Sequence, residues 1–196
     1  MSFSTSNTAA AQPRAASRAP SYYFPLDDFY RESGLQLPKI DLVDGALVPE
    51  PYRQLLVHDG DMTPTLERFH AATIHLKVLR REKRNNVYLR EVVLLTDEQN
   101  KPVEFGAIKI FLDLFPTAAR NDILAERLPL GTILGKYKIT HTSRPKGFLR
   151  IESDDFINRA LALTGRHTLY GRRNTLSNPD GKPLAEIVEI LPPAQT

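Results

Sequence analysis

The chain has 196 residues and is 41% hydrophobic, which suits one domain with a substantial core and is too short for two. Its formal net charge is +3, and the first 26 residues add Arg14 and Arg18 without any acidic residue. The rest of the chain is nearly neutral, which argues against a nucleic-acid-binding protein. The absence of cysteine excludes disulfide bonds and thiol nucleophiles, and we expect a cytoplasmic protein.

The N-terminal segment has the composition of a disordered tail. Residues 1–24 are rich in Ser, Ala, Thr and Pro, and their weak amphipathic pattern favours such a tail over an organelle transit peptide. No apolar run approaches the roughly 20 residues that a membrane helix needs. We therefore expect a tail over residues 1–24 and a single domain without a membrane span over residues 25–196.

The first predicted elements follow a proline-containing segment, residues 25–49, which we expect to wrap irregularly around the domain. Residues 51–58 indicate a short helix with proline in its first turn. Residues 72–79 alternate apolar and polar side chains like a half-buried strand. A polar turn over residues 80–86 leads into a second strand over residues 87–95, and a third is predicted over residues 103–112.

The C-terminal half adds helices and further hairpins. Pro116 begins a helical segment that extends to residue 128, and a second short helix covers residues 130–134. Strands are predicted over residues 147–152, 168–175 and 184–191. Because strands come in hairpins with helices between the pairs, the sequence predicts an α+β domain. We expect a single antiparallel sheet of about six strands with helices on one side.

Motifs for several common chemistries are missing from the sequence. It contains no glycine-rich phosphate loop, no Gly-x-Ser-x-Gly elbow and no His-Glu-x-x-His, and no two of the five histidines have metal-ligand spacing. We expect neither a metal nor an organic cofactor. The basic run from Lys77 to Arg84 is interpreted as a solvated hairpin tip with, at most, a role in steering a polyanionic substrate.

Two charged residues interrupt strands that otherwise suit burial, Arg90 in residues 87–95 and Glu189 in residues 184–191. A buried guanidinium costs several kcal/mol unless an anion compensates it. Arg90 therefore either pairs internally, with Glu91 of a neighbouring strand or with Glu189, or binds an anionic ligand. Glu186 and Glu189 lie on opposite and equally apolar faces of their strand, so periodicity does not choose which one points inward.

Five fragments occur in an order that resembles one known family. They are Asp61-Met62-Thr63-x-x-Leu66-Glu67, Tyr88-Leu89-Arg90-Glu91, Pro129-Leu130-Gly131-x-x-Leu134, Tyr170-Gly171-Arg172-Arg173, and Gly181-Lys182-Pro183-Leu184 followed by Glu189-Ile190-Leu191-Pro192. Over residues 51–193 the chain resembles the chorismate pyruvate-lyase family, and most closely the bacterial branch related to the mycobacterial 4-hydroxybenzoate synthase.

The resemblance implies a cofactor-free lyase, with a chorismate lyase-like fold, that converts chorismate to 4-hydroxybenzoate and pyruvate beneath flap-like segments. It implies that Arg90 binds the ring carboxylate and that Glu189 contacts the ring hydroxyl, either as a base or only to orient the substrate. It also implies that Met62 contributes its backbone and that Leu130 lines the pocket. For the second carboxylate of chorismate, our candidate is Arg172.

One departure from the family concerns Ala107, because the best-known enterobacterial lyases carry an arginine at that position. Two alternatives to the chorismate lyase also stand beside it. The chain could bind an aromatic acid without turnover, as the similarly folded effector domains of certain bacterial transcription regulators do. It could also be a lyase that releases a different hydroxybenzoate isomer.

Overall fold

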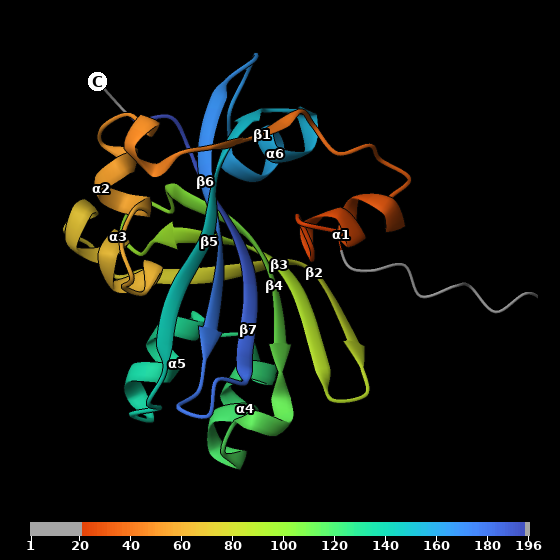
Figure 1. Ribbon diagram of the computed structural model, residues 1–196, viewed down its shortest axis with the longest axis vertical. Coiled ribbons are helices and arrows are strands. Elements are labelled where there is room, and N and C mark those ends of the chain that lie inside the picture. Colours follow the sequence, from red (N-terminus) through yellow and green to blue (C-terminus); the bar gives the residue numbers. More distant parts are fainter. Residues whose placement is uncertain (1–20, 195–196) are drawn as a thin grey trace, which may run out of the picture.

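A single antiparallel sheet of seven strands forms the centre of the computed structural model, which describes residues 21–194 (Figure 1). The strand order is β1-β5-β6-β7-β4-β3-β2, and each neighbouring pair is antiparallel. The strands are β1 (Ile40–Val43), β2 (Ile74–Arg84), β3 (Val87–Thr96), β4 (Pro102–Phe111), β5 (Thr142–Glu152), β6 (Thr168–Ser177) and β7 (Pro183–Leu191).

Helices cover both faces of this sheet. Four of them pack with the face that carries Val92 and Ile108, whereas α1 and α6 pack with the opposite face, which carries Val93 and Phe105. The helices are α1 (Leu26–Glu32), α2 (Tyr52–Leu56), α3 (Met62–His70), α4 (Thr117–Ala125), α5 (Leu130–Lys136) and α6 (Asp155–Leu161), with 3-10 turns at Gly45–Leu47 and Leu112–Leu114.

The predicted single antiparallel sheet in an α+β domain is confirmed, and the structure differs from the prediction in two details. The seventh strand is β1, a four-residue edge strand that pairs only with β5 and is too short to show alternation in the sequence. The expectation of helices on one side is too simple. The apolar residues of α1 and α6 fill a second core, because both faces of the central strands are apolar.

Irregular pairing explains where the predicted strand ends were wrong. Residues 80–84 belong to β2 and not to a turn, because a bulge between Val78 and Arg80 shifts the alternation partway along the strand. The turn into β3 is reduced to Asn85 and Asn86. A second bulge between Pro145 and Gly147 has the same effect in β5, which begins at Thr142 and not at residue 147.

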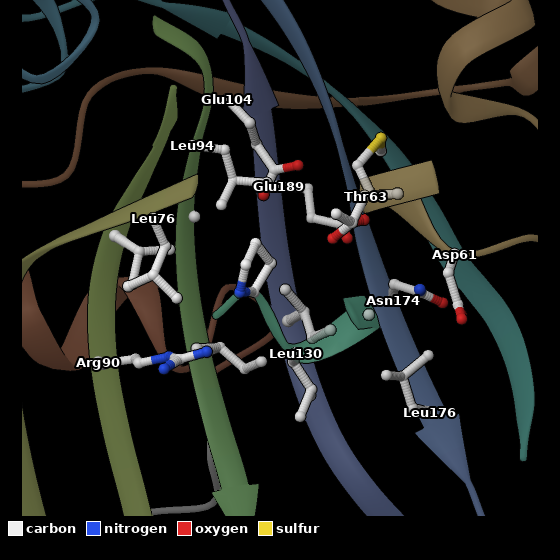
Figure 2. A pocket seen from close by; sticks show the side chains of 17 residues that line it. Asp61, Thr63, Leu76, Arg90, Leu94, Glu104, Leu130, Asn174, Leu176 and Glu189 are labelled. Atoms are coloured by element: carbon white, nitrogen blue, oxygen red, sulfur yellow. The ribbon is translucent and has the colours of Figure 1, made fainter. Parts of the chain in front are cut away.

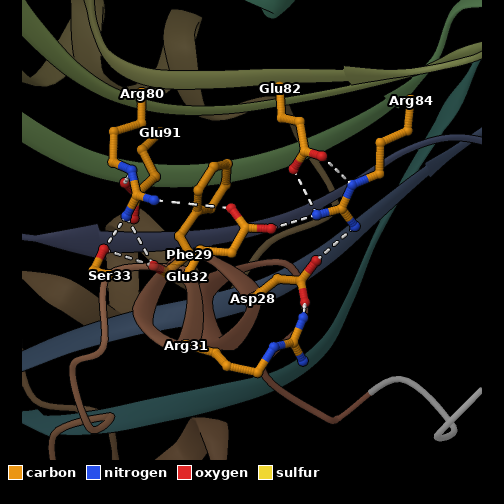
Figure 3. A network of polar contacts seen from close by, with 9 residues as sticks. All are labelled: Asp28, Phe29, Arg31, Glu32, Ser33, Arg80, Glu82, Arg84 and Glu91. Carbon is orange, nitrogen blue, oxygen red and sulfur yellow. Dashed lines mark hydrogen bonds and ion pairs between the residues drawn. The ribbon is translucent and has the colours of Figure 1, made fainter. Parts of the chain in front are cut away.

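The basic run of β2 docks α1 onto the sheet (Figure 3). Arg80 donates through Nη1 to the carbonyl oxygen of Phe29 at 2.8 Å. Arg84 pairs with Asp28, with 3.0 Å from Nη1 to Oδ2, and also with Glu32. The interpretation of this run as a solvated tip therefore needs correction, because two of its arginines hold a helix in place.

The domain extends further towards the N-terminus than residue 25. The Tyr22 hydroxyl donates to the carbonyl oxygen of Lys146 at 2.7 Å, and the Tyr23 hydroxyl donates to that of Ile40 at 3.2 Å. Residues 21–24 thus belong to the domain, while residues 1–20 of the predicted tail lie outside the described residues. Within residues 21–194, no helix is long and apolar enough to cross a membrane.

Candidate functional site

The strand register brings residues from distant parts of the chain into one row on the face that carries Val92. Arg90 of β3 lies opposite Ile108 of β4, which lies opposite Ile187 of β7. In the next row, Gly106 of β4 lies opposite Glu189 of β7. Because alternate residues share a face, Arg90 and Glu189 both project to this side. Standard sheet spacings separate their Cα atoms by about 12 Å.

The first turns of α3 and α5 cover this part of the sheet. Met62 and Thr63 begin α3, and Leu130 and Gly131 begin α5. A Cβ atom on Gly131 would lie 2.9 Å from Oγ1 of Thr63, so glycine is what allows the two helices to approach this closely. Both pairs of residues line the space enclosed between helices and sheet. The backbone contact implied for Met62 and the ligand contact implied for Leu130 stay predictions.

The enclosed pocket is apolar along its walls and polar at its ends. About 550 Å³ of its space is not filled by atoms, and part of this space is open to solvent. The part of this space that the centre of a water-sized sphere can reach is about 60 Å³, which is below the roughly 300 to 1,000 Å³ of small-molecule sites, so a ring ligand requires the pocket to widen. Arg90 lies at one end, and Glu104 and Glu189 lie together at the other (Figure 2). The apolar walls between them include Leu76, Val92, Leu94, Ile108, Leu176 and Ile187.

Arg90 is the least compensated charge in the pocket. Its side chain is 2% exposed, and neither Nε nor Nη1 has a hydrogen-bond partner among residues 21–194. Burial lowers the pKa of Arg90, against the opposing influence of Tyr88 and Glu126. An arginine nevertheless stays charged in proteins. Such a buried cation, directed into a cavity, is suited to bind an anion.

Neither internal partner considered for Arg90 is available. Glu91 faces the opposite side of the sheet, where its nearest cation is Arg80, with 3.8 Å between Nε and Oε2. The Glu189 carboxylate accepts a hydrogen bond from Nε of Arg172. The internal ion pair is therefore absent among the described residues, and the ligand-binding alternative remains for Arg90.

The two glutamates of β7 are separated by face. Glu189 is 4% exposed and lines the pocket. Glu186 lies on the other face, where its carboxylate is 3.2 Å from Nζ of Lys109 and 3.6 Å from Nη2 of Arg173. Glu189 thus has the inward orientation that the resemblance implied, while its role with a ligand stays a prediction.

Arg172 lies behind the pocket wall and not in its lining. Besides Glu189, its guanidinium binds the segment between α2 and α3, donating to the carbonyl oxygens of Leu56 at 3.3 Å, His58 at 3.1 Å and Gly60 at 3.1 Å. These bonds occupy the guanidinium. The suggestion that Arg172 binds a second carboxylate is therefore not supported by its position. Its contacts instead fix the α2–α3 segment and orient Glu189.

Glu104 is a pocket residue that the sequence reasoning missed. Its side chain is 4% exposed, and Oε2 has no hydrogen-bond partner among the described residues. Burial and the neighbouring charge of Glu189 raise its pKa well above the ordinary value, although Arg172 acts in the opposite direction. In the sequence, Glu104 shares a strand face with Gly106 and Ile108. That face could be identified as the pocket face only from the register of β4 against β3 and β7.

Asp61 connects the start of α3 to the strand that follows α5. It is the N-terminal capping residue, yet its side chain does not cap the helix. Its carboxylate lies 3.0 Å from Nε2 of His141, whose Nδ1 is 2.8 Å from the carbonyl oxygen of Ile139. Burial alone would lower the pKa of His141, but Ile139 and Asp61 together raise it. A protonated His141 donates both hydrogen bonds and so links the start of α3 to the segment that precedes β5.

The described residues give no sign of a metal centre, because no group of three or more His, Asp or Glu side chains in residues 21–194 is arranged to hold an ion.

Comparisons with known proteins show the fold. No protein-family model matches the chain, and no curated protein matches it. The effector domain of PhnF from Mycobacterium smegmatis is similar with a TM-score of 0.51, 11% sequence identity and coverage of 67% of this chain and 88% of that chain. A longer PhnF structure from the same organism gives a TM-score of 0.53, 12% identity and coverage of 69% and 65%.

A GntR-family transcriptional regulator from Enterococcus faecalis V583 also matches, with a TM-score of 0.42, 11% identity and coverage of 64% of this chain and 94% of that chain. The PhnF matches show that this chain has a chorismate lyase-like fold of the type found in regulator effector domains. At these identities a shared fold does not transfer a ligand or an activity. The lyase family suggested by the five sequence fragments stays a prediction.

Proposed function

We propose that the pocket binds a small cyclic carboxylic acid whose carboxylate is held by Arg90. The observation that carries this proposal is a buried guanidinium with two unpartnered nitrogen atoms at the end of an apolar cavity. A carboxylate completes the hydrogen bonding of such a fork in a bidentate geometry, which a lysine cannot reproduce. The apolar walls suit the ring.

The more specific form of the proposal is that the ligand is chorismate and that the chain is a lyase releasing 4-hydroxybenzoate and pyruvate. It is supported by the five sequence fragments and by the positions of Arg90 and Glu189 at opposite ends of one pocket. Loss of the enolpyruvyl group from C3 with the proton at C4 produces an aromatic ring. Because this step is strongly downhill, we expect that holding the reactive conformer in the pocket supplies much of the rate.

The second candidate is a binding module without catalytic activity. It is supported by the similarity to the PhnF effector domain, which covers 88% of that chain. In this case the same Arg90 contact would fix the ligand, and the chain would report its presence to another domain or partner. The comparisons favour this candidate more than they favour the lyase.

One experiment separates the two candidates. The full chain is incubated with chorismate, pyruvate is followed by a coupled reduction to lactate, and the aromatic product is identified by chromatography. In parallel, 4-hydroxybenzoate is titrated calorimetrically. Pyruvate with 4-hydroxybenzoate supports the lyase, and another isomer revises its product. Binding without pyruvate supports the binding module. An absence of both contradicts the ligand class.

A further inference from the structure

The end of the pocket opposite Arg90 holds two carboxyl groups that share one cation. Glu104 and Glu189 are each 4% exposed, and both line the pocket. Arg172 is hydrogen bonded to Glu189, whereas Oε2 of Glu104 has no partner among the described residues. Two neighbouring buried carboxyl groups are disfavoured from being ionised at the same time. The ion pair selects Glu189 as the charged member.

The protonated form of Glu104 is consequently favoured, because burial and the charge of Glu189 raise its pKa well above the ordinary value against the opposing influence of Arg172. A protonated carboxyl is an O–H donor, while the ionised Glu189 is an acceptor. The pair therefore presents a donor beside an acceptor, which is the combination that a hydroxyl group satisfies. A carboxylate at this end of a ligand would instead face the charge of Glu189.

The backbone at Gly106 makes room for this arrangement. A Cβ atom there would lie 3.0 Å from Oε1 of Glu104 and 3.4 Å from Cγ2 of Val92. The Glu104 side chain thus lies over the one residue of β4 that offers no side chain on this face. Gly106→Ala is therefore expected to displace the Glu104 carboxyl without altering its chemistry.

We propose that Glu104 is a second ligand-binding residue, whose carboxyl binds a neutral oxygen substituent at the end of the ligand opposite the carboxylate held by Arg90. This inference rests on the proposed function and adds a selectivity to it. The pocket prefers ring acids with a hydroxyl or carbonyl oxygen across the ring from the carboxylate, and Glu104 is the residue responsible.

The test is a calorimetric titration of the full chain with 4-hydroxybenzoate and with benzoate, which differ only in that hydroxyl group. The wild type is expected to bind 4-hydroxybenzoate about tenfold more tightly, a difference that one net hydrogen bond provides. Glu104→Val should abolish the preference while leaving the affinity for benzoate within about twofold. Glu104→Gln, which keeps a donor of similar shape, should retain most of it.

Two further variants sharpen the test. Gly106→Ala is expected to reduce the preference through displacement of Glu104, whereas Glu186→Gln, on the opposite face of β7, should not change it. A Glu104→Val protein that still prefers 4-hydroxybenzoate, or a wild type without any preference, overturns the role of Glu104 and leaves the Arg90 site standing. A wild type that binds neither acid overturns the proposed function itself.

Discussion

Charged side chains in otherwise apolar strands carry most of the functional information at the scale of single residues. Arg90 and Arg172 are both buried, but only Arg172 has its guanidinium occupied by protein groups. A buried charge without a partner is costly, which indicates that such a residue serves ligand binding and not stability. The contrast between the two arginines therefore distinguishes a binding residue from a structural one.

Separate glutamine substitutions at Glu186 and Glu189 test which glutamate of β7 faces the pocket. Glu189→Gln keeps the side-chain shape and removes the charge. If Glu189 is the base in chorismate turnover, the rate should fall by about 10²- to 10⁴-fold. A much smaller loss would indicate that it only orients the ligand. Glu186→Gln, on the other face, should leave kinetics and ligand affinity unchanged, and a damaging Glu186→Gln beside a silent Glu189→Gln would contradict the site.

The burial of Glu91 leads us to expect that the stability of the fold depends on pH. It is fully buried, and neither carboxylate oxygen has a hydrogen-bond partner among the described residues. Burial raises its pKa to about 7, with Arg80 opposing and Glu32 assisting. The folded state therefore retains a proton that the unfolded state has released between about pH 4.5 and pH 7, so stability falls as pH rises through that window, by about 3 kcal/mol in all.

Urea denaturation at pH 5 and pH 8 checks this. Glu91→Gln cannot ionise, so its free energy of unfolding should change less between the two pH values than that of the wild type. Part of the dependence will remain, because Glu104 also has a raised pKa. The exposed Glu98 offers a control, and Glu98→Gln should behave as the wild type does. Equal pH dependence in wild type and Glu91→Gln would contradict the assignment.

At the scale of elements, one arginine joins β6, β7 and the segment between α2 and α3. Arg172→Leu would leave Glu189 buried without its cation and three carbonyl groups without their donor. Breaking a buried pair in this way typically costs about 3 to 5 kcal/mol. We expect a loss of this size in the free energy of unfolding, measured by urea denaturation near neutral pH.

The neighbouring Arg173 provides the matched control, because it points to the other face and pairs with the part-exposed Glu186. Arg173→Leu should cost about 1 kcal/mol or less. The double variant Arg172→Leu with Glu189→Leu removes both charges and should recover part of the loss. Equal losses for Arg172→Leu and Arg173→Leu would show that the buried pair does not hold this region together.

The apolar pattern of the hairpin strands made the central strands predictable, whereas the edge strand, several helices and the irregular strand ends were missed. The sequence indicated β3, β4 and β7 closely, because apolar runs bounded by turn residues mark them. It missed β1, which has four residues at an edge, and the helices α1, α3 and α6. The bulges in β2 and β5 interrupt the alternation on which the reading depended.

For the whole molecule, the site was predictable only as far as single residues reveal it. Arg90 and Glu189 stood out as charges in apolar strands, and the structure brings both into one pocket. Glu104 and the true contacts of Arg172 did not stand out, because they depend on which strands pair and in which register. The hydrogen bond from Arg172 to the carbonyl oxygen of Leu56 joins residues 116 positions apart, and no local pattern in the sequence encodes such a contact.

The contact between Arg90 and a ligand carboxylate is the central claim of the proposed function. Calorimetric titration of 4-hydroxybenzoate into wild type, Arg90→Ala and Arg90→Lys tests it directly, with circular dichroism to verify folding. Arg150→Ala, which removes an exposed pair with Asp41, serves as the control. Loss of a desolvated charge contact typically costs about 2 to 5 kcal/mol.

This contact therefore predicts binding about 30- to 4,000-fold weaker in Arg90→Ala. It also predicts weakened binding in Arg90→Lys, which lacks the fork, and unchanged binding in Arg150→Ala. A folded Arg90→Ala protein that binds 4-hydroxybenzoate as tightly as the wild type does would contradict it.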